Sequence, residues 1–189
     1  MRSTGPRTPK IGVLALQGAV DLHCPHIEKA GGEFRRVKTA KDFDDVDGFI
    51  LPGGESTTML KLIDRFGLWE SLAKNFAAKP VWGICAGAIL MAQTVTNPDQ
   101  KSFGLLPMTV ERNAYGTQAD SHGDVIEGYQ VSFIRAPVFT DVANDINVLA
   151  SHQGRPAWVQ KGTHMASAFH PEINLDAPSP MHKAFLDLF

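Results

Sequence analysis

Apolar runs of strand length alternate with helical patterns through the first half of the chain. Residues 11–16 form a continuous apolar run, and residues 47–52 and 80–84 form two more. Such runs are typical of strands buried on both faces of a parallel sheet. Between them, apolar residues recur at helical spacing from about 19 to 30 and from 56 to 76, which predicts helices packed against that sheet.

The remaining elements are shorter. A strand is expected at residues 33–37 and a helix at 86–94, whereas the segment from about 103 to 170 has the pattern of several short strands. Residues 181–189 predict a closing helix. Because strands alternate with helices, the sequence predicts a doubly wound α/β fold with a mostly parallel sheet flanked by helices.

Composition favours one domain with a substantial core. The chain has 189 residues, is 43% hydrophobic and carries a formal net charge of −2, and single domains commonly contain roughly 100–200 residues. No linker, repeat or low-complexity tract divides the sequence. We therefore expect a flexible leader at residues 1–9, which lacks the apolar segment of a signal peptide, and a single domain at residues 10–189.

Charge and cysteine content limit the partners and the compartment. The near-neutral balance provides no basic surface for nucleic acid or an anionic membrane, and no apolar stretch approaches the ~20 residues that span a bilayer. The cysteines are Cys24 and Cys85, too few for a disulfide-stabilised secreted domain. We expect a cytoplasmic protein that binds neither nucleic acid nor membrane.

Cys85 lies between Gly83 and Gly87, where a predicted strand meets a predicted helix. A nucleophile on such a tight turn needs small neighbours, because its own backbone is strained and the flanking segments pack closely. The backbone N–H of Ala86 is available to an oxyanion, and the positive end of a helix favours a thiolate. Unpaired cysteines also commonly serve only as buried apolar residues, so this stretch alone leaves both interpretations open.

The triplet His170-Pro171-Glu172 follows the last predicted strand. In extended backbone, residues i and i+2 point to the same side, about 6.6 Å apart along the chain. A carboxylate at Glu172 could then accept a hydrogen bond from one ring nitrogen of His170 while the other nitrogen approaches a nucleophile. An exposed turn without a function is the alternative, but together with Cys85 the pattern favours a catalytic triad.

The turn Gly53-Gly54 also follows a buried strand, at the edge of the sheet where ligands bind in open α/β folds. Glycine permits the backbone to turn an N–H group into a site. We therefore expect Gly53, Gly54 and Ala86 to form an oxyanion hole, with Ser56 capping the next helix. The segment lacks the phosphate-binding pattern of a P-loop, although a simple turn remains an alternative.

His23, Cys24 and His26 are close enough in sequence to suggest a metal site. Their spacing is tighter than that of common zinc sites and a further ligand is missing, so we expect neither a metal nor a cofactor. Pro25 lies within the same predicted helix and is expected to delay or kink it.

Taken together, the elbow around Cys85, the triplet at His170 and the turn at Gly53 resemble class I (triad) glutamine amidotransferases. The stretches IGVLALQGA, LPGGESTTM, GLLPMTVERN and FIRAP, in this order, are more specifically similar to the glutaminase subunits of pyridoxal 5′-phosphate synthase. The similarity extends from about Lys10 to Glu172.

The resemblance implies a flavodoxin-like glutaminase domain that hydrolyses L-glutamine to glutamate and ammonia. It also implies a hetero-oligomer in which the ammonia passes to a separate, barrel-shaped synthase subunit that makes the vitamin B6 coenzyme. In such proteins the residues that match Cys85, His170 and Glu172 are the catalytic triad. The residues that match glutamine contacts are Gly54, Glu55, Ser56, Arg112, Ile134 and Arg135.

The sequence departs from the family pattern in a few places. Ala88 stands where leucine is common, and Thr117 and His122 stand where arginine and phenylalanine are usual, in a region that the family uses near its partner. Two other functions are also compatible with the sequence. One is a triad glutaminase of another complex, such as that for imidazole glycerol phosphate, and the other is a non-catalytic α/β subunit with a packed or redox-sensing cysteine.

Overall fold

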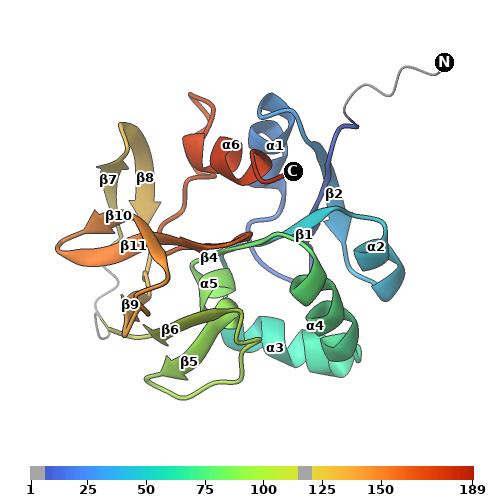
Figure 1. Ribbon diagram of the computed structural model, residues 1–189, viewed down its shortest axis with the longest axis horizontal. Helices are drawn as coiled ribbons and strands as arrows, with labels where there is room; N and C mark the ends of the chain where they lie inside the picture. Colours follow the sequence, from blue (N-terminus) through green and yellow to red (C-terminus); the bar gives the residue numbers. More distant parts are fainter. Residues whose placement is uncertain (1–6, 115–120) are drawn as a thin grey trace.

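The computed structural model describes residues 7–114 and 121–189. Within them, a sheet of seven strands has the order β10-β11-β12-β4-β3-β1-β2 (Figure 1). Neighbouring strands from β12 to β2 are parallel, and β10 and β11 extend the sheet in antiparallel fashion. The strands are β1 (Lys10–Leu14), β2 (Glu33–Val37), β3 (Gly48–Leu51), β4 (Val81–Ile84), β10 (Asn147–His152), β11 (Arg155–Lys161) and β12 (His164–Ser167).

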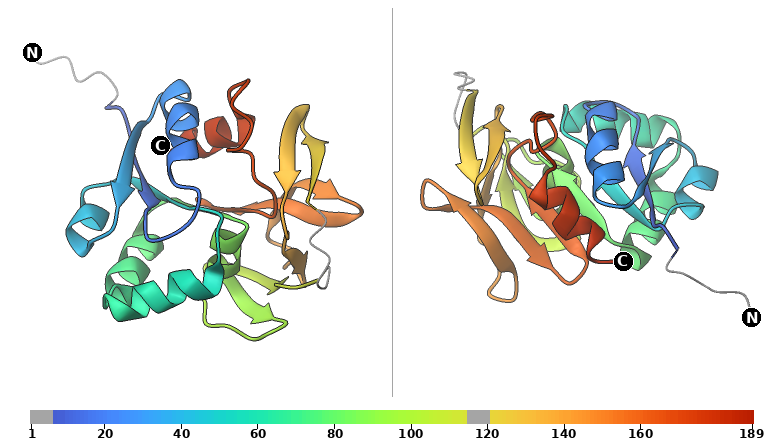
Figure 2. Two further views of the ribbon diagram at one scale, coloured as in Figure 1. Left: turned by 180° about the vertical axis from the view of Figure 1, so that it is seen from behind. Right: turned by 90° about the horizontal axis from the view of Figure 1, so that it is seen from above.

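Helices cover both faces of this sheet, which confirms the predicted doubly wound, mostly parallel α/β fold (Figures 1 and 2). One face carries α2 (Ala40–Asp44), α3 (Ser56–Arg65), α4 (Trp69–Ala78) and α5 (Ala86–Met91), and the other carries α1 (Cys24–Lys29) and α6 (Pro180–Leu186). The smaller sheets contain β5 (Ala92–Thr96), β6 (Leu106–Glu111) and β9 (Val138–Thr140), and the hairpin of β7 (His122–Ile126) and β8 (Tyr129–Phe133).

Alternate residues of the central strands enter opposite cores. Phe49 and Leu51 of β3 pack among the α2–α5 helices, where the ring of Phe76 meets that of Phe49 at 5.1 Å. Ile50 lies between them in sequence and packs on the other face with Ile27 of α1. All of these side chains are buried, so both faces of the strand contribute apolar burial to the stability of the fold.

Two predicted helices have different bounds in the structure. The helix expected from residue 19 begins as a short 3-10 turn at Asp21–His23 and becomes α-helical only at Cys24, because Pro25 occupies the first turn. The helix expected at 86–94 ends at Met91. It gives way to β5, whose Thr94-Val95-Thr96 sequence is rich in β-branched residues and pairs with β6.

The observed N-terminal caps of two helices differ from what the sequence analysis predicts. Ser56 is the first residue of α3 and not its N-cap; the carboxylate of Glu55 accepts the Thr58 N–H at 2.9 Å instead. The short helix α2 was not predicted, although Thr39 and Asp42 form a reciprocal capping box at its start. Polar caps therefore fix where these helices begin.

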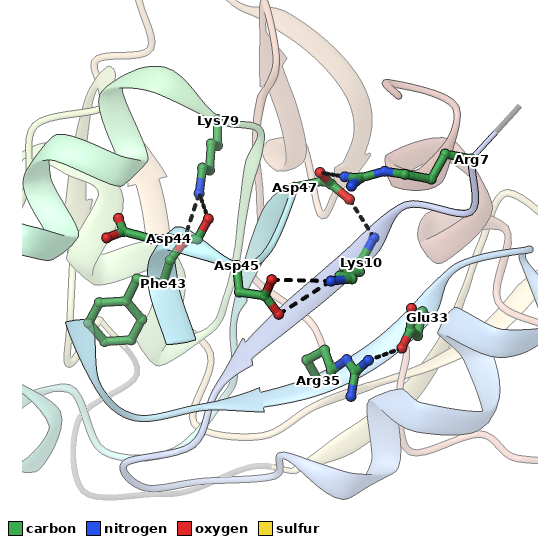
Figure 3. Close-up of polar contacts among 9 residues, drawn as sticks. All are labelled: Arg7, Lys10, Glu33, Arg35, Phe43, Asp44, Asp45, Asp47 and Lys79. Atoms are coloured by element: carbon green, nitrogen blue, oxygen red, sulfur yellow. Dashed lines mark hydrogen bonds and ion pairs between the residues drawn. The ribbon is translucent and has the colours of Figure 1, made fainter. Parts of the chain in front are cut away.

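Charged groups lie at the end of the sheet where β1 begins (Figure 3). The backbone N–H of Lys10 donates to Asp47 at 2.7 Å, and its ammonium group pairs with Asp45 at 3.2 Å. The ammonium group of Lys79 donates to the carbonyl oxygen of Phe43 at 2.7 Å, and burial lowers the pKa of Lys79. These contacts tie the α2–β3 connection to β1 at the edge opposite the carboxyl ends of the strands.

Part of the predicted leader at residues 1–9 lies outside the described residues. Thr117 also lies outside them. In its described portion, the Arg7 side chain pairs with Asp47. The division between a leader and a single domain from residue 10 remains a prediction.

Gly87 allows α5 to approach β3 closely. A Cβ atom at this position would overlap with the carbonyl oxygen of Leu51. We expect Gly87→Ala to lower the free energy of unfolding by about 1–3 kcal/mol, the usual cost of overpacking a core, measured by urea denaturation. Gly123→Ala is the matched control, since its nearest contacts would be at 3.8 Å; an equal loss of stability in both variants would contradict the packing argument.

Candidate active site

The parallel strands β1, β3, β4 and β12 end at the same edge of the sheet. The residues that follow them converge on a cavity of about 360 Å³, the position where open α/β sheets bind ligands. The structure brings all the site residues predicted from the sequence to this cavity: Gly53, Gly54, Glu55, Ser56, Cys85, Ala86, Arg112, Ile134, Arg135, His170 and Glu172.

Cys85 occupies a strained turn between β4 and α5. Its φ of 50° and ψ of −103° are rare for a residue with a side chain. A Cβ atom on Gly83 would lie 2.5 Å from the carbonyl oxygen of Gly87, so the flanking glycines are needed for the turn. The Cys85 N–H donates to the carbonyl oxygen of Ser167 at 2.8 Å. This bond connects the turn to the end of β12, which leads to His170.

His170 and Glu172 form a buried pair that lines the same cavity. The His170 Nδ1 and Glu172 Oε1 atoms are 2.7 Å apart, and Glu172 is fully buried. The backbone of His170 exchanges hydrogen bonds with Ser132, at 2.7 and 3.2 Å. The ring of His170 is therefore held both by its own backbone and by the carboxylate.

Electrostatics strengthen this pair. Burial on its own lowers the pKa of His170, but hydrogen bonds with Cys85 and Glu172 and the negative charges of both groups outweigh burial and raise the pKa of His170 to about 10. Burial on its own raises the pKa of Glu172, whereas the bond to His170 and nearby positive charge lower it. The net effect favours a charged carboxylate beside a protonated ring.

The Gly53-Gly54 turn packs directly against the His170 ring. A Cβ atom on Gly53 would overlap with the His170 Cε1 atom, so only glycine fits at this position. The carbonyl oxygen of Gly53 accepts the Ala19 N–H at 3.1 Å, and the Gln17 side chain accepts the Glu55 N–H at 2.8 Å. The turn is thus fixed from two sides by the loop that follows β1.

Two arginines line the cavity in different surroundings. The guanidinium group of Arg112 donates to Thr57 at 2.7 Å, lies 3.5 Å from the Glu55 carboxylate and is mostly buried. The structure records no hydrogen bond or ion pair for Arg135 among the described residues, and Arg135 is exposed. The Ile134 carbonyl oxygen lies 3.9 Å from the Cys85 sulfur.

Some residues at or near the cavity were missed by the sequence analysis. Gln17 lines the cavity from the loop that follows β1, so its position after a buried strand was an available signal. Tyr129 was not: its hydroxyl group lies within 2.8–3.2 Å of three carbonyl oxygens, those of Pro171, Asn174 and Ala177. It fixes the segment on both sides of Glu172 through contacts that only the folded chain creates.

Within the ranges 7–114 and 121–189, no three histidine, cysteine, aspartate or glutamate side chains are grouped to hold a metal ion. His23 and His26 instead contact other buried polar groups. The same ranges contain no helix long and apolar enough to cross a membrane.

This fold is the class I glutamine amidotransferase fold. A solved structure described as a glutamine amidotransferase superposes with a TM-score of 0.84 and 36% sequence identity, covering 94% of this chain and 97% of that one. More specifically, the chain belongs to the SNO glutamine amidotransferase family, whose family model matches residues 13–189. The family resemblance and the fold class inferred from the sequence are thus confirmed.

Individual relatives agree with this membership. A protein of Solibacter usitatus (strain Ellin6076), named pyridoxal 5′-phosphate synthase subunit PdxT, is 43% identical over 94% of this chain and 97% of its own length. The PdxT protein of Bacillus thuringiensis (strain Al Hakam) is 45% identical over 88% of this chain and 89% of its own. A GMP synthase subunit structure from Thermoplasma acidophilum, at 17% identity and a TM-score of 0.65, shares the fold.

The raised pKa of His170 predicts a pH dependence of stability. Because the folded state binds this proton more tightly than the unfolded state, the stabilisation is complete below the ordinary pKa of 6.5 and is lost as pH rises towards about 10. Between pH 7 and 10, we expect the free energy of unfolding to fall more in the wild type than in His170→Gln, by at least about 1.4 kcal/mol, the equivalent of one pKa unit. If the free energy of unfolding, measured by urea denaturation, changed equally with pH in both proteins, the raised pKa of His170 would be contradicted.

Proposed function

We propose that this chain is the glutaminase subunit of a pyridoxal 5′-phosphate synthase and hydrolyses L-glutamine to glutamate and ammonia. The observation that carries the proposal is the joint position of Cys85, His170 and Glu172 on one cavity, in a chain of the SNO glutamine amidotransferase family. A thiol, an imidazole and a buried carboxylate in this order are the groups required for nucleophilic amide hydrolysis.

In the first half of the proposed reaction, the Cys85 sulfur attacks the side-chain carboxamide carbon of glutamine. The carbonyl oxygen gains negative charge, and the backbone N–H of Ala86 and the Gly53-Gly54 turn are the proposed donors to it. Such donors typically contribute a few kcal/mol each to the stability of the transition state. His170 then protonates the departing nitrogen, so that the C–N bond breaks and ammonia leaves a thioester on Cys85.

In the second half, His170 removes a proton from water as the water attacks the thioester carbon. The C–S bond breaks, glutamate is released and Cys85 is regenerated. Glu172 orients the ring of His170 and stabilises its charged form through the 2.7 Å hydrogen bond at Nδ1. The other ring nitrogen is thereby left for the proton transfers at Cys85.

The substrate is a zwitterion at its α-carbon, so its site needs one positive and one negative group side by side. Arg112 and Glu55, 3.5 Å apart and both on the cavity, have these properties. We assign the α-carboxylate to the Arg112 guanidinium group, whose geometry suits a carboxylate, and the α-ammonium group to Glu55. Ser56, Ile134 and Arg135 complete the proposed contacts.

The partner in this proposal is a separate synthase subunit, barrel-shaped in the family, which receives the ammonia in the cytoplasm. Support comes from the relatives at 42–45% identity, which carry the name pyridoxal 5′-phosphate synthase subunit PdxT. A triad glutaminase of another complex is less well supported, because the structural relatives named for other pathways are below 20% identity and share the fold alone. A non-catalytic subunit has no need of the strained backbone at Cys85.

The nucleophile is tested by Cys85→Ala. We expect this variant to lose glutamine hydrolysis completely, because it has no sulfur to form the thioester, while it keeps its fold and its binding to the cognate synthase. Ammonia release is measured with and without that synthase, next to Cys24→Ser as the control for loss of a thiol. Ammonia production by Cys85→Ala at the wild-type rate would refute the proposal.

The assignment of the α-carboxylate is tested by Arg112→Lys. A lysine retains the charge but not the two-point contact, so we expect the KM for glutamine to rise about tenfold while kcat changes much less. This corresponds to the loss of one charge-assisted hydrogen bond. Arg135→Lys is the matched control, and a larger rise of KM in that variant would transfer the role to Arg135.

A further inference from the structure

Behind Glu172 lies a group of buried histidines that the proposed reaction does not use. His23, His26 and His182 are 0%, 2% and 0% exposed and come from the 3-10 turn, α1 and α6. The rings of His26 and His182 stack at 4.7 Å. Burial lowers the pKa of all three, that of His23 to about 4, so they are neutral near pH 7.

The contacts of His26 determine its tautomer. The backbone N–H of Ser179 donates to His26 Nδ1 at 3.3 Å, so the ring proton must be on Nε2. His26 Nε2 then donates to the main-chain carbonyl oxygen of Glu172 at 3.2 Å. This ring therefore holds the backbone of the catalytic carboxylate, not its charge.

His23 and His182 are joined by one hydrogen bond. The His23 Nδ1 and His182 Nε2 atoms are 2.9 Å apart, so one of them donates and the other accepts. Among the described residues, three buried atoms of this region have no hydrogen-bond partner: Glu172 Oε2, His23 Nε2 and His182 Nδ1. Glu172 Oε2 is an acceptor on a negatively charged carboxylate. The two ring nitrogens are protonated or not according to which ring donates in the His23–His182 hydrogen bond.

A buried carboxylate oxygen without a donor is costly, and this decides between the two proton arrangements. If His182 donates from Nε2 to His23 Nδ1, the ring proton of the neutral His23 is on Nε2, and the nearby negative charge of Glu172 favours a donor there. The opposite arrangement would present a bare nitrogen to that charge. In the first arrangement the unprotonated nitrogen that lacks a partner is His182 Nδ1, which is separated from Glu172 by the ring of His23.

We propose that His23, oriented by His182, is a positioning residue for Glu172: its Nε2–H donates across one bridging water to the second carboxylate oxygen, while Oε1 accepts from His170. The inference rests on the proposed glutaminase reaction, because it assigns a role to His23 through Glu172. With this donor, each oxygen of Glu172 has a hydrogen-bond partner, which keeps a buried carboxylate in a fixed orientation.

The groups that face Glu172 set the expected pH effect. They are His170, His23, His26 and Tyr129, and burial together with the charge of Glu172 raises the pKa of Tyr129 to about 12. Tyr129 is therefore neutral over the working range, and His23 and His26 do not become charged near pH 7. Removing the His23 donor raises the pKa of Glu172. As the pH is lowered, the Glu172 carboxylate is then protonated, and its function lost, at a higher pH than in the wild type.

The test compares His23→Phe with His23→Gln, both assayed with the cognate synthase between pH 5 and 9. His23→Phe is expected to lower kcat about tenfold, the effect of one hydrogen bond to a charged group, with KM nearly unchanged because His23 does not line the cavity. Its acid limb of kcat/KM moves to higher pH. His23→Gln retains a side-chain N–H and recovers most of both properties.

His164→Gln is the matched control, since His164 contacts the carbonyl oxygen of Phe76 at 2.9 Å, away from the cavity. It is expected to behave as the wild type. The proposal is overturned if folded His23→Phe has the wild-type kcat and acid limb, or if folded His23→Gln is as impaired as His23→Phe.

A readout that does not require activity is the tautomer of His23 in the wild-type chain, seen in long-range ¹H–¹⁵N spectra. A proton on Nε2 with a bare Nδ1 is expected, and the reverse tautomer overturns the proposal even if the variants fail to fold. Inactive wild type with synthase present would refute the proposed function instead, so the two failures are distinguishable.

Discussion

The site depends on how closely three backbone segments approach one another at the carboxyl ends of β3, β4 and β12. Gly87 brings α5 against the Leu51 carbonyl oxygen, and Gly53 leaves room for the ring of His170. The Cys85 N–H bond to Ser167 joins the second segment to the third. A single added methyl group at either glycine would overlap with atoms of the neighbouring segment.

Much of this arrangement follows from the sequence, because parallel strands necessarily end at the same edge of a sheet. The turns after the apolar runs contain Gly53, Cys85 and His170, and their position on one cavity requires only the predicted topology. Local signals were less reliable. The helix predicted at 86–94 includes Ala92 to Thr94, which belong to β5, and the cap of α3 is Glu55 and not Ser56.

The surroundings of Glu172 could not be predicted in this way. His23 and His182 are 159 residues apart in sequence and meet only because α1 and α6 lie side by side on one face of the sheet (Figure 1). No periodicity indicates such a contact. The hydroxyl group of Tyr129, which holds the segment after Glu172, depends likewise on the placement of the β7–β8 hairpin. Long-range packing thus determines the electrostatics of a site whose members the sequence already identifies.

The measurement that tests the central claim most directly is alkylation of the chain by a glutamine-analogue electrophile, mapped by peptide mass spectrometry. If sulfur, imidazole and substrate contacts share one cavity, the label is found on Cys85 and not on Cys24, L-glutamine protects against it, and His170→Gln slows it. Equal labelling of both cysteines, unaffected by glutamine or by the loss of His170, would contradict the account.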